Sequence, residues 1–558
     1  MKKKYIFLTA AVSSLALTAC EDMDTKPEGG FVTEEQKSEI YANDPSKTSA
    51  AVDGSFRKLS ARTPNESSVG EAHNDFGYPS IMLFTDVNGE DVVGKVTGYN
   101  WFSHEIRFTD RSVSSYIAQM VWQDLYSYIN GANGIVASVD HETTNAQTQF
   151  SLAQGYALRA FAYFQLAQLF QFNYVGHESS PCVPIVTDEN AEEFASEGGK
   201  RATVQEVYDL IYSDIDRAIE LLSASAEGGY SRGSNKYLVD LATAYGIRAR
   251  VNLVTRKWAA AAADAESAIS NSDAAPASIA DVSTPTFWDI ADNNWMWGID
   301  VAETDPVVIS GIVNFPSMIG SLNYGYANYH GGFQISKKLW ASIPDTDVRK
   351  GWWLNEKGEA THVSGTDTID HISASMKAGS LDYFGCLPGQ FYAPLTNVKF
   401  GPYKGEVGTT TNANDVILMR IEEMYLIKAE AELMSGGNGL ATLTEFVKTY
   451  RDPEYSYAGS DVHEEIWRQR RIELWGEGIS WFDIMRLGTG INRLGTGHEK
   501  LYTFVMSGDD TKLLWPIPES EVQANKQLTE ADYNPTSPTP QPVKATGTET
   551  IYDEKINM

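Results

Sequence analysis

Cysteine is scarce in this chain of 558 residues, which contains only Cys20, Cys182 and Cys386. No two cysteines are separated by just two residues, so the CxxC pairs typical of structural zinc sites are missing, and we expect no site of that kind. Cys20 has a separate explanation, given below. The other two cysteines are either a disulfide pair or two thiols, and the sequence leaves both alternatives open.

Basic residues are few relative to acidic ones. The chain has 44 Lys and Arg against 74 Asp and Glu, which gives a formal net charge of -30. Proteins hold nucleic acids mainly through contacts of Lys and Arg with phosphates, so a surface this acidic repels them. We therefore expect no nucleic-acid partner.

Motifs of common enzyme and cofactor classes are missing as well. The sequence contains no HExxH, GxSxG, Walker A or GxGxxG pattern. The stretch from Asp86 to Asp91 resembles the start of a calcium loop, but it lacks the glycine and the glutamate that such a loop needs further on. We therefore expect no metal, no cofactor and no catalysis.

No apolar run is long enough to span a membrane. The N-terminal run 5–17 has about 13 residues, whereas a transmembrane helix needs about 20. It follows three lysines and ends in Leu-Thr-Ala-Cys at 17–20, which matches the bacterial lipobox. We expect residues 1–19 to be a removed signal peptide and Cys20 to be the lipidation site. Residues 20–30 then form an acidic, glycine-containing tether.

Residues 31–275 are expected to form an N-terminal helical region. Apolar residues recur at intervals of three and four residues within this region, for example along 204–222, and this spacing predicts helices. Segments 238–253 and 258–269 predict two helices joined by a short turn, with alanines where the helices must approach closely. This pairing, with Trp258 opening the second helix, is typical of tetratricopeptide-like hairpins.

Residues 276–410 are expected to be irregular, because Gly, Asn, Ser, Thr and Pro interrupt short apolar runs. Within this region, alternation from Trp295 through Trp297 predicts a strand with one buried face. Helices are expected to return at 415–434 and 462–487.

These segments complete the predicted organisation of the chain. A C-terminal helical region covers 411–533 and a Pro/Thr-rich tail covers 534–558. The predicted fold class is mainly α: a tetratricopeptide-like helical scaffold with an irregular, loop-rich ligand-binding face and a few short strands.

Aromatic residues are interleaved with amides in two non-helical segments, 99–102 and 323–330. A sugar packs the C–H groups of one ring face on an aromatic plane, and its hydroxyls need polar partners. This composition predicts carbohydrate binding, against the alternative that these aromatics are core or ordinary loop anchors. The candidate ligand-binding residues are Trp101 with Asn100, then Tyr324, Tyr326 and Tyr329 with Asn323 and Asn328, and lastly Asp91.

Several motifs resemble the SusD/RagB family of outer-membrane nutrient-binding lipoproteins. Residues 122–133 (WxxxYxxIxxAN) are similar to one of the family's helices. Residues 420–431 (RIxExYLxxAEA) and 470–486 (RRxELxxEGxxxFDxxR) match more specific family patterns. In the last motif Arg470, Glu473 and Glu477 stand three and four residues apart, and we expect them to form a structural charge network on one helix face.

The resemblance implies a protein that is not an enzyme. It implies a lipid-anchored protein of the outer membrane, facing the cell surface, that binds an oligosaccharide or polysaccharide and delivers it to a SusC-like TonB-dependent transporter. The expected partners are that transporter, the glycan, and outer-membrane lipid through acylated Cys20. The resemblance also implies that the loop before the Trp122 helix, which holds Trp101, contacts the glycan.

Three alternatives stay open at this point. A peptide-binding, RagB-like member would use the same face, and retention on a polysaccharide gel separates it from a glycan binder. A transporter lid or scaffold would have no glycan affinity of its own. A glycosidase would release reducing sugar.

Overall fold

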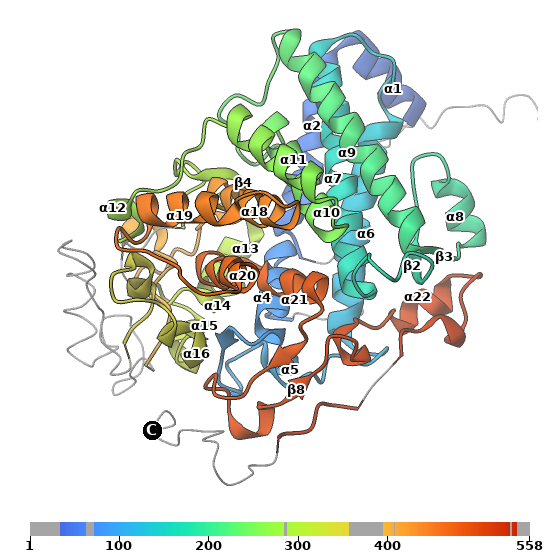
Figure 1. Ribbon diagram of the computed structural model, residues 1–558. Helices are drawn as coiled ribbons and strands as arrows, with labels where there is room; N and C mark the ends of the chain where they lie inside the picture. The colour runs from blue at the N-terminus through green and yellow to red at the C-terminus, as the bar shows by residue number, and fades with distance from the viewer. Residues whose placement is uncertain are drawn as a thin grey trace, which may run out of the picture.

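The computed structural model describes residues 34–62, 72–283, 287–355, 394–406, 408–535 and 538–543. It shows a mainly helical protein, as predicted (Figure 1). The long helices are α6 (Tyr116–Ala137), α7 (Ala146–Phe170), α9 (Val204–Glu227), α10 (Leu241–Val254), α11 (Trp258–Asn271), α18 (Ile421–Met434), α19 (Gly439–Tyr450) and α20 (Val462–Glu473). Cys20 and Cys386 lie outside the described residues, so the lipid anchor stays a prediction, and both alternatives for Cys182 and Cys386 stay open.

The long helices pack side by side as a layered scaffold. Helix α7 contacts both α6 and α9, and α11 contacts both α10 and α18. Nearly every residue of α7 is buried, because a helix with neighbours on several sides has no face left for solvent. The predicted pair 238–253 and 258–269 is confirmed as α10 and α11, with buried alanines such as Ala244 and Ala265 at their contact.

Side chains at the N-caps define where several of these helices begin. Asn145 accepts a hydrogen bond from the backbone N–H of Thr148 at the start of α7, at 3.0 Å. Thr203 and Glu206 form a reciprocal capping box at the start of α9. Each cap pairs backbone donors that would otherwise lack an intrahelical partner.

Shorter helices and turns complete the N-terminal and C-terminal parts. They are α1 (Glu34–Asn43), η1 (Pro45–Lys47), α2 (Thr48–Arg57), η2 (Lys58–Ser60), α4 (Tyr78–Asn88), α5 (Ser103–Arg107), α8 (Ala191–Glu197), α21 (Ser480–Leu487), η6 (Lys500–Tyr502), η7 (Thr511–Leu513), α22 (Glu519–Ala524) and η8 (Glu530–Asp532). None of the helices in the described ranges has both the length and the apolar character needed to cross a bilayer.

The described residues in the middle of the chain form short helices and turns. They are α12 (Ile279–Val282), α13 (Pro306–Ile309), α14 (Phe315–Ile319), α15 (Tyr326–His330), α16 (Lys337–Ala341), η3 (Val348–Trp352) and η5 (Tyr403–Gly405). Figure 1 shows several of them gathered at one side of the helical layers, away from α8 and α22.

The strands form antiparallel two-stranded pairs. The pairs are β1 (Val92–Val93) with β5 (Gln334–Ile335), β2 (Pro181–Pro184) with β3 (Arg201–Thr203), β4 (Trp295–Ile299) with β6 (Val416–Arg420), and β7 (Ile491–Asn492) with β8 (Val505–Met506). The predicted strand at Trp295 is confirmed as β4. All five of its residues are buried, so the expected single buried face is wrong: core packs against both sides.

Two predicted helices are each divided in the structure. Segment 415–434 begins as strand β6 and becomes helix only at Ile421, because its first residues pair with β4. Segment 462–487 is interrupted after Glu473, where Gly476 and Gly478 adopt positive φ values of 77° and 71°. Glycine adopts this conformation readily, so the two glycines end α20 and set α21 at a new angle.

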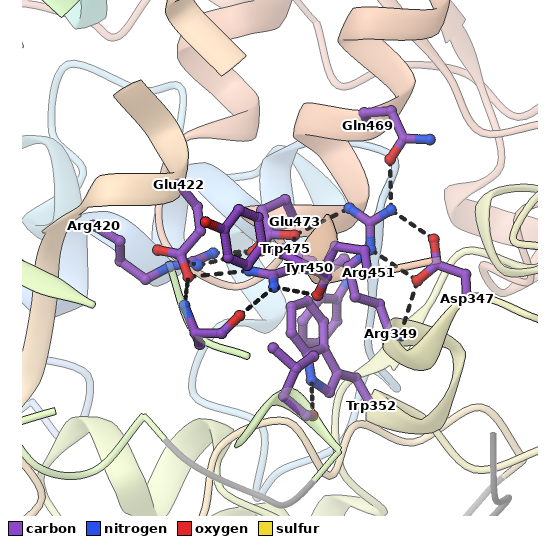
Figure 2. Close-up of polar contacts among 12 residues, drawn as sticks. Asp347, Arg349, Trp352, Arg420, Glu422, Tyr450, Arg451, Gln469, Glu473 and Trp475 are labelled. Atoms are coloured by element: carbon purple, nitrogen blue, oxygen red, sulfur yellow. Dashed lines mark hydrogen bonds and ion pairs between the residues drawn. The ribbon is translucent and has the colours of Figure 1, made fainter. Parts of the chain in front are cut away.

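A buried charge network joins the middle region to the C-terminal helices (Figure 2). The carboxylate of Glu473 accepts hydrogen bonds from Arg451 at 2.8 Å, from Arg420 at 2.9 Å and from Arg349 at 3.0 Å. Burial by itself would raise the pKa of Glu473. The charges and hydrogen bonds of the surrounding arginines outweigh burial and hold this pKa well below its usual value.

The predicted charge network is therefore present and lies inside the core, but its pairing differs from the expectation. Arg470 does not bond to Glu473. It donates to Asp483 of α21 at 2.8 Å. Glu477 lies beyond the end of α20 and accepts from Arg420 and from the buried Lys399. Partners distant in the sequence thus outcompete the neighbours on the same helix.

Candidate ligand-binding site

Two segments that carry the predicted aromatic residues meet in the structure. The turn that holds Tyr99 and Trp101 lies between β1 and α5, and Tyr324, Tyr326 and Tyr329 lie on and beside α15. The ring centroids of Tyr99 and Tyr329 are 5.3 Å apart, and those of Trp101 and Tyr326 are 6.1 Å apart. These five residues, together with His73, are called the aromatic cluster below.

The pairing of β1 with β5 brings the two segments together. Val92 pairs with Ile335 and Val93 with Gln334, so the chain that leaves β1 runs beside the chain that enters β5 from α15. Gly94 follows directly and lies against the ring of Phe333, where a Cβ atom would be only 2.7 Å from the ring carbon Cε1. Only glycine permits this approach, so the turn can lie close to α15.

Trp101 is half-buried at one end of the aromatic cluster. Its ring stacks on His73 with centroids 4.5 Å apart and planes 27° apart, and its carbonyl accepts a hydrogen bond from Asn74 at 3.1 Å. The hydroxyl of Tyr326 is hydrogen-bonded to Nδ1 of His73. Burial raises the pKa of Tyr326 above its ordinary value, so its phenol stays a hydrogen-bonding neutral group. The Trp101 ring is thus supported from behind.

Tyrosines form the other end of the cluster. Tyr99 is 55% exposed, which is the highest exposed fraction among the side chains of the aromatic cluster. The hydroxyls of Tyr324 and Tyr329 are 3.1 Å apart and their rings are nearly perpendicular, at 82°. This end presents ring surface together with phenolic donors and acceptors.

The three asparagines predicted as hydroxyl partners are buried. Asn100 donates to the carbonyl of Lys95 at 2.8 Å and accepts from the N–H of Phe102 at 3.0 Å. Asn328 accepts from the N–H of Gly325 at 2.9 Å, and Asn323 donates to Asn412. The structure places these amides inside the turns that carry the aromatics, where they pair backbone and neighbouring polar groups, instead of on the surface where we expected them.

Asp91 also lies in a different environment from the one expected. Its carboxylate is held by Arg471, at 2.5 Å and 2.8 Å, and by the hydroxyl of Ser480 at 3.2 Å. The side chain is 2% exposed and makes none of the ring contacts that define the cluster. Asp91 therefore ties β1 to the C-terminal helices. Among the described residues, no group of three or more His, Cys, Asp or Glu could hold a metal ion.

Sequence reasoning missed two members of the cluster. Tyr99 belongs to one of the aromatic segments, but only the fold shows that its ring is exposed and lies against Tyr329. His73 carried no signal, because no pattern places it near Trp101. Its role as the supporting ring appears only when the segment before α4, which holds His73, packs against the turn before α5, which holds Trp101.

Family models match two stretches of the sequence. A model described as "Starch-binding associating with outer membrane" matches residues 82–253, and one described as "SusD family" matches residues 368–535. The first match contains the Trp101 turn, and the second contains both C-terminal motifs noted above. The SusD-like protein P38 of Formosa agariphila is 23% identical over 429 residues, which cover 71% of this chain and 76% of that protein.

Solved structures share the fold. A SusD-like carbohydrate binding protein from Bacteroides vulgatus has a TM-score of 0.68 at 23% identity and covers 87% of this chain and 97% of its own. Surface glycan-binding protein A from Bacteroides thetaiotaomicron, solved in complex with laminarihexaose, has a TM-score of 0.58 at 17% identity and covers 88% and 99%. The matching models and the shared architecture confirm the resemblance stated from the sequence motifs: this chain belongs to the SusD family.

Proposed function

We propose that this chain is a cell-surface lipoprotein that binds an oligosaccharide or polysaccharide and delivers it to a partner TonB-dependent outer-membrane transporter. The observation that carries the proposal is the aromatic cluster. Two segments more than two hundred residues apart in the sequence bring Trp101 and the tyrosines to one surface of a SusD fold.

The chemistry of the cluster fits a neutral sugar. Trp101 offers a ring surface that His73 holds in place, so little side-chain freedom is lost when a ligand packs on it. The C–H face of a pyranose packs well against such a ring, and the phenols of Tyr324 and Tyr329 can exchange hydrogen bonds with sugar hydroxyls. The buried asparagines act indirectly in this proposal, because they hold the two turns in shape.

The relatives support carbohydrate as the ligand class. One matching family model is described as starch-binding, and one protein of the same fold was solved with laminarihexaose. In our proposal the chain binds without catalysis. Lipidation of Cys20 and docking on the transporter belong to the same proposal, and they rest on the lipobox and the family resemblance.

Affinity electrophoresis of residues 20–558 carrying Cys20→Ala tests the proposal. The gels contain laminarin, starch, xylan, mannan or host mucin glycans. We expect one of these to retard the protein, and we expect Trp101→Ala to abolish most of that retardation without lowering the Tm. Trp258→Ala is the matched control, since Trp258 is also half-buried but opens α11 on the helical scaffold.

Each other outcome favours a different function. A lower Tm with retardation intact would make Trp101 a core residue and remove it from the site. No retardation on any glycan, with binding of a peptide digest, would favour peptide capture. Binding of neither, with uptake still dependent on the protein, would favour a transporter lid. Release of reducing sugar by the pure protein would show a glycosidase.

A further inference from the structure

A concave surface lies apart from the aromatic cluster and shares no residue with it. It is a cleft of about 490 Å³ at the end of α9, bounded by the loop that leads into α10, by the end of α11 and by the loop before β4. Figure 1 shows this connecting loop leaving the top of α9. The volume lies within the range of about 300–1,000 Å³ that is usual for small-molecule sites.

The floor of the cleft is aromatic and apolar. Phe150, Leu222 and Trp295 line it and are buried, and Tyr230 stands half-buried at its side with its ring 5.4 Å from that of Phe150. Trp295 is 1% exposed, and its indole N–H has no hydrogen-bond partner in the described part of the chain.

The two cationic side chains that line the cleft, Arg232 and Lys236, are already engaged by the protein. The guanidinium of Arg232 pairs with Asp240 and donates to the carbonyls of Leu238 and Met296, at 2.7 Å and 2.9 Å. The ammonium of Lys236 donates to the carbonyl of Asp292 at 2.7 Å. An anionic ligand would have to draw these cations away from their present partners, whereas a neutral ligand would not.

The rim is polar and exposed. Asn293, Asp273 and Ser234 line it from three different loops, so amide, carboxylate and hydroxyl groups converge on the opening. Aromatic floor, neutral charge balance and a rim of mixed donors and acceptors are together the surroundings that a short neutral oligosaccharide requires.

We propose that this cleft is a second carbohydrate-binding site, separate from the aromatic cluster. The inference rests on the proposed function for its ligand class. A chain with both sites could bind one polysaccharide at two points along its length. Its overall affinity for that polysaccharide would then exceed the affinity of either site alone.

Isothermal titration of residues 20–558 carrying Cys20→Ala, with laminarihexaose and with maltohexaose, tests the cleft. We expect Trp101→Ala to leave residual binding at the cleft. Adding Tyr230→Ala should weaken that residual binding by about tenfold, the loss expected for one stacking contact. Tyr245→Ala, a half-buried tyrosine on α10 that does not line the cleft, should change nothing.

A second variant tests the cleft without altering the loop that holds Tyr230, in case Tyr230→Ala disturbs the fold of that loop. Ala226 is exposed on α9 and lines the cleft, so Ala226→Trp should fill the cleft and abolish residual binding while the Tm stays unchanged. The cleft proposal is overturned if Trp101→Ala removes all binding, or if the residual binding survives Ala226→Trp. It is equally overturned if only a tryptic digest of casein binds there, or if neither hexaose binds. The proposed function is contradicted by a different result, namely a Trp101→Ala protein that binds glycan as tightly as the parent.

Discussion

Trp101 and Asn100 are adjacent in the chain but contribute to the surface in different ways. Trp101 is half-buried with its ring stacked on His73, and Asn100 is buried with its amide bonded to Lys95 and Phe102. A residue of the first kind contacts a ligand, and a residue of the second kind holds the turn that presents it. The same division separates the exposed Tyr99 from the buried Asn323 and Asn328.

Tyr99→Ala and Asn100→Ala should therefore affect different properties: the first should weaken glycan binding, and the second should lower stability. Removing the exposed ring of Tyr99 should weaken glycan binding by about tenfold and leave the Tm unchanged. Removing the amide of Asn100 leaves the half-buried carbonyl of Lys95 and the buried N–H of Phe102 without this partner, which should cost about 1–3 kcal/mol of unfolding free energy. Titration calorimetry and urea denaturation of both variants separate the two effects. Equal loss of stability in both would contradict this assignment.

At the scale of elements, the short pair β1–β5 is what assembles the aromatic cluster. It joins the turn 94–102 to the end of α15, and the close contact of Gly94 with Phe333 sets how near they lie. The cluster should accordingly respond to changes in this pair that touch none of the exposed rings.

Gly94→Ala tests that dependence. The new Cβ would lie 2.7 Å from the Phe333 ring and 3.0 Å from the Asn100 amide, so the turn must shift, at a cost of about 1–3 kcal/mol. We expect lower stability and weaker glycan binding together. Gly98→Ala is the matched control in the same turn, since nothing lies within 4 Å of its added Cβ. If both variants bind glycan like the parent, the pair does not position the cluster.

His330 should make the stability of the α15 region depend on pH. Burial, with a smaller contribution from the nearby charge of Lys95, lowers the pKa of this histidine from 6.5 to about 4. The folded state therefore disfavours the proton that the unfolded state accepts below pH 6.5. Stability is fully present above pH 6.5 and is lost as the pH falls toward 4, by about 3 kcal/mol in all.

The measurement is the unfolding free energy of the parent and of His330→Gln between pH 7 and pH 4. The variant lacks the titrating group, so its stability should fall less steeply over this range, even though its absolute stability is lower. Parallel curves for the two proteins would show that His330 does not contribute.

At the scale of the whole molecule, the buried charge network holds together parts that are distant in the sequence. Arg349 comes from the middle region, and Arg420, Arg451 and Glu473 come from separate elements of the C-terminal part (Figure 2). The carboxylate of Glu473 pairs with all three arginines, which also pair with Asp347, Glu422 and Glu477. Its removal would leave one buried positive charge in excess, in an interior that solvates charge poorly.

Glu473→Gln should thus be severely destabilising. We expect a loss of about 3–5 kcal/mol in unfolding free energy, because the variant breaks three buried ion pairs and leaves one buried positive charge in excess of the remaining carboxylates. Glu464→Gln, at an exposed position on the same helix, should leave stability nearly unchanged. Chemical denaturation compares the two. A Glu473→Gln protein as stable as the Glu464→Gln protein would show that the network is dispensable.

The sequence by itself determined the parts of this protein that depend on near neighbours. Helices such as α9, α10 and α11 follow from spacings of three and four residues, and the alternation at Trp295 predicted β4. The motifs that resemble SusD were also readable without a structure, as were the two aromatic segments of the candidate site.

Only the tertiary structure decided which residues face solvent and which partners meet. Residues 416–420 are strand because β4 lies beside them, Arg470 bonds Asp483 because α21 turns back toward α20, and the asparagines are buried because their turns close around them. His73 joins the cluster for the same reason. Exposure and long-range pairing depend on contacts between distant segments, and local sequence patterns carry no record of those contacts.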